Sequence, residues 1–304
     1  MDFPKIPADL MMKLLEPPVG RVRMVLDTDT YNEVDDQFAL AYAIKSGEKI
    51  SLEAIYAAPF YNDRSTGPAE GMELSFQEIN KILSIMNCSS QFPVFRGSTD
   101  YLKNRSRPEE SDAVKDLIKR AMESDEKDPL YVVAIGAVTN VASAIMLEPD
   151  IIKKIVVVWL GGNALHWHDT KEFNLMQDIA ASRVILDSGV PLIRIPVMGV
   201  TTHLHTTIPE LESCLSGKSP IGTYLTDIVK NYTKNPYAWS KVIWDVAAIA
   251  WIVNPDWVPT HIEHSPVLTD QLTWSFDRSR HLIRSAYFVH RDPVFGDLFK
   301  KLTE

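Results

Sequence analysis

Short apolar runs alternate with longer amphipathic segments along most of the chain, and this rhythm predicts strands that alternate with helices. Strands are expected at residues 21–29, 50–58, 93–97, 130–136, 154–162 and 191–197. Helices are expected at residues 35–47, 72–86 and 112–122, and from Val138 onward. The alternation predicts a parallel sheet with crossover helices, and the nearly continuous apolar strands indicate burial on both faces.

The pattern becomes less regular after about residue 196. Helical segments are expected near residues 208–231 and 242–252, and a strand is expected at residues 281–290. We interpret about 208–252 as a helical cap and residues 1–20, interrupted by Pro and charged residues, as an N-terminal arm. The fold class predicted is therefore α/β, a single domain over 1–304 with a mostly parallel, doubly wound sheet of about eight strands.

Composition adds limits on the partners of the chain. Of the 304 residues, 45% are hydrophobic and 23% charged, which is typical of a globular protein with a sizeable core. The net charge of -9 repels polymeric nucleic acid and anionic membranes. Cys88 and Cys214 are far apart in sequence and belong to no metal-binding pattern. These features, with no signal peptide or membrane-spanning run expected, favour a cytoplasmic protein that binds a small molecule.

Acidic residues are concentrated directly after the first predicted strand. The five are Asp27, Asp29, Glu33, Asp35 and Asp36. Ligands of open α/β sheets bind beyond the carboxyl ends of the strands, and a hard cation such as Ca²⁺ binds six to eight oxygen atoms. The alternative for the last two is a helix start, where the helix dipole favours acidic side chains.

Four segments in order carry a resemblance to a known family. They read LDTDTYNEVDDQFAL, AIGAVTNVASAIMLEP, KEFNLMQD and IWDVAAIAWIVNP, and they span most of residues 23–255. The chain thereby resembles the inosine-uridine preferring nucleoside hydrolase family of calcium-dependent N-ribohydrolases. The resemblance implies the nucleoside hydrolase fold, a homodimer or homotetramer, and an N-glycosyl hydrolase that releases free base and ribose from a nucleoside or related N-riboside.

The resemblance also implies roles for individual residues. The Ca²⁺ ligands would be the side chains of Asp29, Asp36 and Asp245 and the main-chain oxygen of Ile135. The substrate-binding residues would be Asp35, Asn62, Glu172, Asn174 and Asp245. Asp29 would also accept the proton of the attacking water, and Asp27 would orient its neighbours.

Two departures from the family pattern affect the expected chemistry. The segment TYNEV replaces a turn that usually contains Pro-Gly and is two residues longer, which changes the reach of Asp29 toward the following acids. Trp244 stands where pyrimidine-processing and nonspecific members have a His that protonates the leaving base. The purine-preferring branch has Trp there, so the resemblance indicates a purine preference assisted by stacking.

Other residues are weaker candidates, each with a structural alternative. His166, His168 and His203 could donate a proton, although an isolated histidine is more often structural or solvated. Tyr232, Tyr237 and Trp239 could form a lid over the base, with core packing as the preferred alternative for at least two of them.

Two other functional classes remain open from the sequence. One is a non-catalytic ribose-binding or nucleoside-binding homologue, suggested by the altered turn and the missing His. The other is a haloacid dehalogenase-type phosphatase, because these enzymes also open with Asp-x-Asp after a strand. Tyr31 is unusual for that class, which normally carries Thr or Val at this position.

Overall fold

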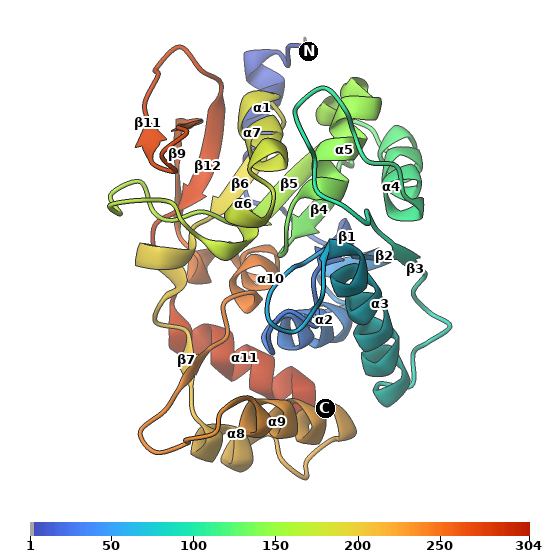
Figure 1. Cartoon of the computed structure of the whole chain (residues 1–304), viewed down its shortest axis with the longest axis vertical. Helices are drawn as coiled ribbons and strands as arrows, with labels where there is room; N and C mark the ends of the chain where they lie inside the picture. Colours follow the sequence, from blue (N-terminus) through green and yellow to red (C-terminus); the bar gives the residue numbers. More distant parts are fainter. Residues whose placement is uncertain (1–2) are drawn as a thin grey trace.

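A mostly parallel sheet of eight strands forms the centre of the computed structural model, which describes residues 3–304 (Figure 1). Residues 1 and 2 of the predicted N-terminal arm lie outside the described residues. The strand order is β3-β2-β1-β4-β5-β6-β12-β9, and only the pair β12 and β9 is antiparallel. The strands are β1 (Val22–Thr28), β2 (Ile50–Ala57), β3 (Val94–Arg96), β4 (Leu130–Ala134), β5 (Ile155–Leu160), β6 (Leu192–Ile195), β9 (Thr260–His264) and β12 (Leu282–Ala286). The predicted α/β fold with about eight strands is confirmed.

Helices and two small two-stranded sheets complete the fold. The α-helices are α1 (Ala8–Leu14), α2 (Asp36–Lys45), α3 (Pro68–Ile85), α4 (Asp112–Met122), α5 (Thr139–Leu147), α6 (Phe173–Gln177), α7 (Ile179–Asp187), α8 (Ile208–Cys214), α9 (Pro220–Tyr232), α10 (Val246–Val253) and α11 (Arg291–Thr303). Shorter helical turns are η1 (Pro149–Lys153), η2 (Val197–Thr201) and η3 (Pro255–Trp257). The small sheets pair β7 (His205–Thr206) with β8 (Lys241–Val242) and β10 (Val267–Leu268) with β11 (Trp274–Ser275). Within residues 3–304, no helix combines the length and apolar character needed to cross a bilayer.

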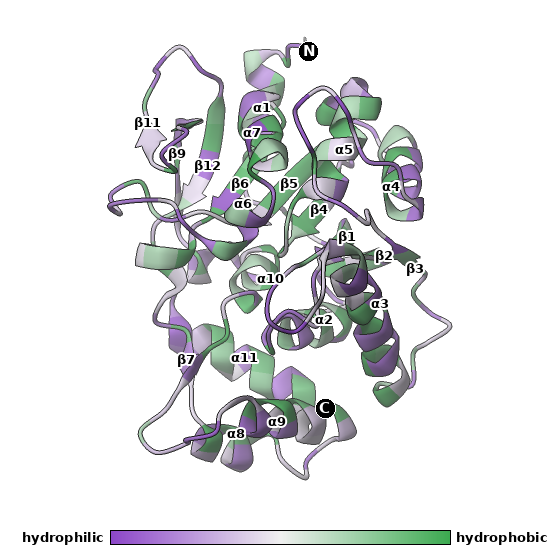
Figure 2. Ribbon diagram, viewed as in Figure 1, coloured by the Kyte–Doolittle hydropathy of each residue, from purple (hydrophilic) through white to green (hydrophobic). Residues whose placement is uncertain are grey.

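The two faces of the sheet are buried in separate hydrophobic clusters because successive strand residues point to opposite faces. In β1, Met24 and Leu26 belong to the cluster that includes α2, α10 and α11, whereas Val25 belongs to the cluster with α4, α5 and α7. In β5, Val158 and Trp159 divide in the same way. Hydrophobic colouring accordingly follows β4 and β5, while α3 and α4 are partly hydrophilic (Figure 2). This arrangement explains why the strands read as continuous apolar runs.

The segment after residue 196 differs in detail from the sequence prediction. The helix expected over 208–231 is divided into α8 and α9, and Gly217 between them has a φ of +72°. The helix expected over 242–252 begins only at Val246, because Lys241 and Val242 pair with β7. All eight residues of α10 are buried, and the helix packs against α2 and β5. Strand β9 and helix α11 were not predicted. The division into arm and cap stays a prediction.

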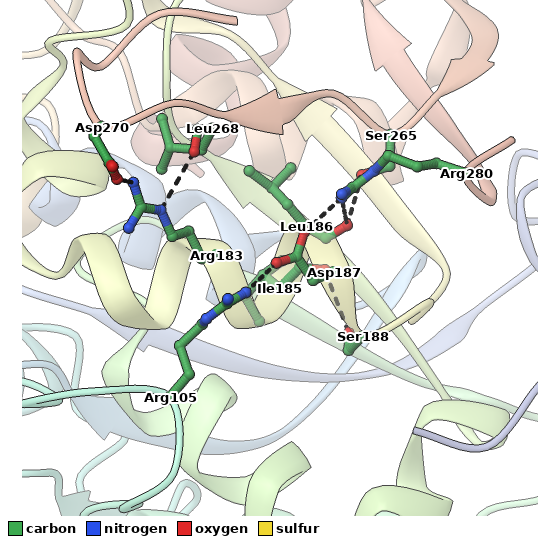
Figure 3. A network of polar contacts seen from close by, with 10 residues as sticks. All are labelled: Arg105, Arg183, Ile185, Leu186, Asp187, Ser188, Ser265, Leu268, Asp270 and Arg280. Carbon is green, nitrogen blue, oxygen red and sulfur yellow. Dashed lines mark hydrogen bonds and ion pairs between the residues drawn. The ribbon is translucent and has the colours of Figure 1, made fainter. Parts of the chain in front are cut away.

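An ion-pair network fixes the segment that carries β10 and β11 against α7 (Figure 3). Arg280 pairs with Asp187 at 2.7 Å, and Arg105 pairs with the same carboxylate. Arg183, also on α7, pairs with Asp270 at 2.5 Å. Most of these side chains are partly exposed, so each pair contributes little alone, but together they hold the segment in one position.

The positioned segment in turn supports the loop that follows β5. The indole Nε1 of Trp274 donates to the carbonyl oxygen of Asn163 at 2.9 Å. Arg194 on β6, only 1% exposed, donates to the same carbonyl at 2.9 Å and pairs with Glu263 on β9 at 3.2 Å. A buried guanidinium with these partners fixes the loop over residues 161–172, which leads directly to a predicted substrate-binding residue.

Candidate active site

A cavity of about 1000 Å³ lies beyond the carboxyl ends of the parallel strands. Asp29 follows β1 and Ile135 follows β4, and these two neighbouring strands mark the point where the order of the sheet reverses. Open α/β sheets place their ligands at such a switch point. The cavity therefore lies where the topology favours a binding site, and its volume is at the upper end for a small-molecule site.

Three carboxylates converge at this cavity. Asp35, Asp36 and Asp245 each place one oxygen so that the three atoms lie within 4.8 Å of one another. Asp35 is the N-cap of α2, Asp36 is its first residue, and Asp245 is the N-cap of α10. Two helix N-termini thus meet here, and their dipoles favour negative charge. Thr28 at the end of β1 fixes Asp36 by donating its hydroxyl hydrogen to Oδ1.

Asp29 lies beside these three residues and is itself fully buried. Neither of its carboxylate oxygens has a hydrogen-bond partner among the described residues. The carboxylate packs directly against Gly136, where an added Cβ would lie 2.9 Å from Asp29 Cγ. Asp27, two residues earlier in β1, accepts a hydrogen bond from Asn140 Nδ2 at 2.7 Å. A buried carboxylate without donors indicates a ligand that supplies positive charge.

The ionisation of the cluster reflects the same crowding. Burial raises the pKa of Asp36 to about 7, and the negative charge of Asp35 adds to this effect. Burial also raises the pKa values of Asp29 and Asp245 well above the usual range, with further repulsion from Asp36. Burial raises the pKa of Asp27 to about 7, although its hydrogen bond with Asn140 acts in the opposite direction. Oxygen donors under mutual repulsion fit a hard divalent cation.

Comparison with known proteins decides the family. The profile described as "Inosine-uridine preferring nucleoside hydrolase" matches residues 24–286. The chain belongs to this family. The match includes most of β1 and all of the acidic cluster, β5 and α10, so the family assignment covers the whole candidate site.

Proteins similar to this nucleoside hydrolase family member include a pyrimidine-specific and a purine-preferring enzyme. A pyrimidine-specific ribonucleoside hydrolase RihB from Shigella flexneri serotype 5b (strain 8401) is 29% identical over 161 residues, which are 50% of each chain. The chain thus spans about half the length of that curated relative. A purine-preferring ribonucleoside hydrolase from Gardnerella vaginalis has a similar structure, with a TM-score of 0.75 and 20% identity over 92% of this chain and 98% of that one. The plant nucleoside hydrolase PpNRh1 gives a TM-score of 0.73 and 19% identity, with 93% and 99% covered. At these identities the two structures show the nucleoside hydrolase fold.

The residues predicted to bind the sugar all line the cavity, but several are also used within the protein. Glu172 accepts hydrogen bonds from three backbone N–H groups, those of Gly162, Asn174 and Leu175, at 2.8 to 3.0 Å. Asn174 donates both amide hydrogens, to the carbonyl oxygens of Ile135 at 3.1 Å and Leu160 at 3.0 Å. Its Oδ1 is left as the acceptor for a ligand.

Asn62 also lines the cavity and makes hydrogen bonds within the protein. Its Nδ2 donates to Asn32 Oδ1 at 2.6 Å, and its Oδ1 accepts from the backbone N–H of Arg64 at 2.9 Å. The first bond joins the loop after β2 to the loop after β1, and the second fixes the loop after β2 itself. The amide therefore positions two loops of the cavity, and its role toward the sugar stays a prediction.

The three histidines considered as proton donors, His166, His168 and His203, lie outside the cavity lining. His203 bonds to the carbonyl oxygen of Val289 and stacks on a neighbouring ring, while His168 has a side chain that is 78% exposed. Their interpretation as acids for the leaving base loses its support because none reaches the cavity.

The predicted lid residues behave differently from one another. Tyr232 lines the cavity, and Tyr237 is 88% exposed. Trp239 is partly buried against the core and lies 6.4 Å from the ring of Tyr232 between centroids. The preferred alternative of core packing therefore fits Trp239 and does not fit Tyr237.

Sequence reasoning missed Lys241, which supports the site from β8. Its Nζ lies 3.4 Å from Asp35 Oδ1 and pairs more closely with Glu33. Burial alone would lower the pKa of Lys241, but the two carboxylates outweigh burial and raise it. The other oxygen of Asp35 accepts a hydrogen bond from the backbone N–H of Trp244 at 3.1 Å. No periodicity or motif distinguishes this lysine from a surface lysine, so only the three-dimensional pairing identifies it.

Proposed function

We propose that the chain hydrolyses the N-glycosidic bond of a nucleoside or related N-riboside at this cavity, with Ca²⁺ bound by the acidic cluster. The main support for this proposal is the fully buried Asp29, whose two oxygens lack partners beside three converging carboxylates. A purely structural cluster of this kind would carry a large desolvation cost with no gain.

The donor set fits Ca²⁺ better than softer transition metals. Asp36 and Asp245 offer converging carboxylate oxygens, and Ile135 borders the same cavity. The unpartnered carboxylate of Asp29 lies buried beside them rather than in the cavity lining. Hard oxygen ligands without His or Cys are typical of a Ca²⁺ or Mg²⁺ site, and a flexible set of six to eight oxygens favours Ca²⁺. A bound ion of this kind supplies Lewis acidity toward a water molecule and the sugar hydroxyls and offsets the repulsion among the acids.

The side chains then have distinct tasks. Asp29 accepts the proton of the attacking water, because its oxygens are free of internal hydrogen bonds. Asp35 accepts a hydrogen bond from a ribose hydroxyl, and Lys241 and the Trp244 backbone hold its carboxylate in place. Asn174 offers Oδ1 to a second hydroxyl while its amide hydrogens remain on β4 and β5. Fixing the sugar in this way lowers the entropy cost of reaching an oxocarbenium-like transition state.

The base is assigned to the part of the cavity lined by Trp244. Trp244 is partly buried and lines the cavity, and its backbone N–H donates to Asp35. A base stacked on its indole ring would therefore lie near the sugar bound by Asp35. Purines offer more stacking area than pyrimidines, which supports a modest purine preference. The name of the Shigella relative indicates pyrimidines and that of the Gardnerella structure purines, so the comparisons leave this choice to experiment.

Of the two alternative functions, the non-catalytic binding homologue remains open and the phosphatase loses its basis. A non-catalytic ribose-binding homologue would keep the cation and the sugar contacts without releasing base, so product formation separates it from a hydrolase. The phosphatase alternative rested on Asp-x-Asp after a strand, and the family match over residues 24–286 accounts for that motif instead. For the setting, we propose a cytoplasmic homodimer or homotetramer, as the family resemblance implies.

Metal analysis tests the cation assignment. Wild-type protein dialysed against Ca²⁺ and then against metal-free buffer should retain one ion per chain. Asp36→Ala should retain none, whereas Asp150→Ala, at an exposed acid on η1, should behave like wild type. Full occupancy in Asp36→Ala would contradict the assignment.

A further inference from the structure

The cavity carries more negative charge than one divalent cation can offset. Seven carboxylate side chains line it, against three cationic lining side chains and Lys241, which pairs with two of the carboxylates, so a divalent ion still leaves the formal charge negative. The carboxylates outside the cluster of three are Glu33, Asp63, Glu78 and Glu172. A cleft lined by one sign of charge concentrates ligands of the opposite sign. The cavity therefore favours a ligand that is itself positively charged.

In the part of the chain that the structure describes, the same lining offers neither a histidine nor a phenol of low pKa to protonate a leaving base. No histidine of residues 3–304 borders the cavity. Burial raises the pKa of Tyr232 to about 12, with a further contribution from Glu33, and burial and Glu78 raise that of Tyr224 further still. A general acid works best with a pKa near the working pH, so these phenols are poor donors to a leaving base. An ordinary base, which must gain a proton on departure, receives little help here.

Aromatic rings complete the cavity, and most already contact cations of the chain. Arg64 lies over Tyr31 at 4.3 Å, Lys81 over Tyr224 at 4.4 Å, and Lys241 near the ring of Tyr232 at 5.6 Å. Among the described residues, Trp244 and Phe173 also line the cavity without such a partner. Trp is the strongest of the aromatic side chains in attracting a cation to its face.

These observations agree on one substrate class. We infer that the enzyme prefers N-ribosides whose base carries a permanent positive charge, such as an N-alkylated purine or a pyridinium ring. When the glycosidic bond breaks, its electron pair passes to the ring nitrogen and neutralises the base, so no proton is needed there. Water supplies the hydroxyl group at C1′ and its remaining proton goes to a carboxylate and then to solvent. The cationic riboside and water thus give neutral base, ribose and one proton.

The inference rests on the proposed hydrolase function, and two matched pairs of substrates test both. 7-Methylguanosine and guanosine differ in the charge of a purine leaving group. Nicotinamide riboside and nicotinic acid riboside share a pyridinium leaving group, but the carboxylate of the second cancels its charge. With Ca²⁺ present, and after division by the uncatalysed hydrolysis rates, kcat/KM should be about tenfold or more higher for the cationic member of each pair.

A double variant tests the electrostatic origin of the preference. Asp63→Asn with Glu78→Gln removes two negative charges from the lining and should reduce the preference within the nicotinamide pair several-fold. The control, Asp150→Asn with Glu110→Gln, removes two exposed charges that do not line the cavity and should leave it unchanged.

The outcomes separate the inference from the function beneath it. Guanosine or nicotinic acid riboside turned over as well as its cationic partner would overturn the inference while leaving the hydrolase function intact. An unchanged preference in the double variant would also overturn it. No base release from any of the four compounds would overturn the hydrolase function and the inference together.

Discussion

The acidic cluster should make the calcium-free protein less stable as the pH rises, and Asp36→Asn should remove much of this effect. The pKa of Asp36 is raised from 3.8 to about 7 in the folded chain. Well below pH 3.8 the carboxyl is protonated in both states. As the pH rises, the unfolded chain loses this proton near pH 4 and the folded chain only near pH 7. The folded state therefore binds more protons in this range, and the free energy of unfolding falls as the pH rises toward 7.

The magnitude follows from the two pKa values. Each pKa unit corresponds to about 1.4 kcal/mol, so the penalty from Asp36 is about 1 kcal/mol at pH 4.5 and about 4 kcal/mol at pH 7. Asparagine keeps the shape and can still accept the hydroxyl hydrogen of Thr28. Relative to wild type, Asp36→Asn should therefore gain up to about 3 kcal/mol of stability between pH 4.5 and pH 7 in the presence of chelator.

Urea unfolding at the two pH values measures the effect directly. Using the difference between variant and wild type cancels titrating groups that do not interact with Asp36, whereas the pKa values of Asp29 and Asp245, raised partly by Asp36, shift the difference in the same direction. Asp150→Asn provides an exposed control of the same chemistry. Excess Ca²⁺ should stabilise wild type at pH 7 and stabilise Asp36→Asn much less, because a ligand that binds only the folded state shifts unfolding by mass action. A difference between variant and wild type that does not change with pH would refute the argument.

Three further changes probe the rest of the site. Lys241→Met should lower the free energy of unfolding by about 3 kcal/mol in urea titrations, because it leaves Asp35 buried without its cation; Lys241→Arg should restore part of the loss. Asn174→Ala removes the bond to the Ile135 carbonyl and should lower kcat/KM for ribosides by the equivalent of about 1 to 3 kcal/mol of transition-state stabilisation. An unchanged kcat/KM would contradict its role. Trp244→Ala should reduce kcat/KM for inosine and guanosine by about tenfold and affect uridine and cytidine less; equal wild-type turnover of uridine would contradict the purine preference.

The sequence predicted the centre of the fold because both faces of the sheet are covered. Residues such as Val158 and Trp159 are buried on opposite faces, so their strand reads as an unbroken apolar run with a clear length. Strand β9 lies at the antiparallel edge, and its pattern of half-buried and exposed residues in THIEH gives no comparable signal. Helix α11 begins with Arg291 and Asp292 before a Pro, which hides its apolar face from a periodicity search.

The site was predictable where it depends on local order along the chain. Asp29 and Asp36 follow one strand, and Asp245 stands at a helix start, so motif order along the chain was enough to propose them as ligands. The structure brings Asp36 and Asp245 together with Asp35, and the role of Asp29 as a ligand stays a prediction. The support given by Lys241 depends on a contact with Asp35 across 206 positions of sequence. Burial, which decides the pKa values and the unpartnered oxygens, likewise appears only after folding.

Base release that depends on Ca²⁺ distinguishes a calcium-dependent nucleoside hydrolase from a binding homologue. Inosine, guanosine, uridine, 7-methylguanosine and nicotinamide riboside would be incubated with chelated protein, and free base and ribose measured by chromatography before and after Ca²⁺ is added. We expect equal amounts of base and ribose from at least one compound, only with Ca²⁺, in wild type and Asp150→Ala but not in Asp36→Ala. Absence of base release from every compound, or equal release by Asp36→Ala, would contradict this expectation.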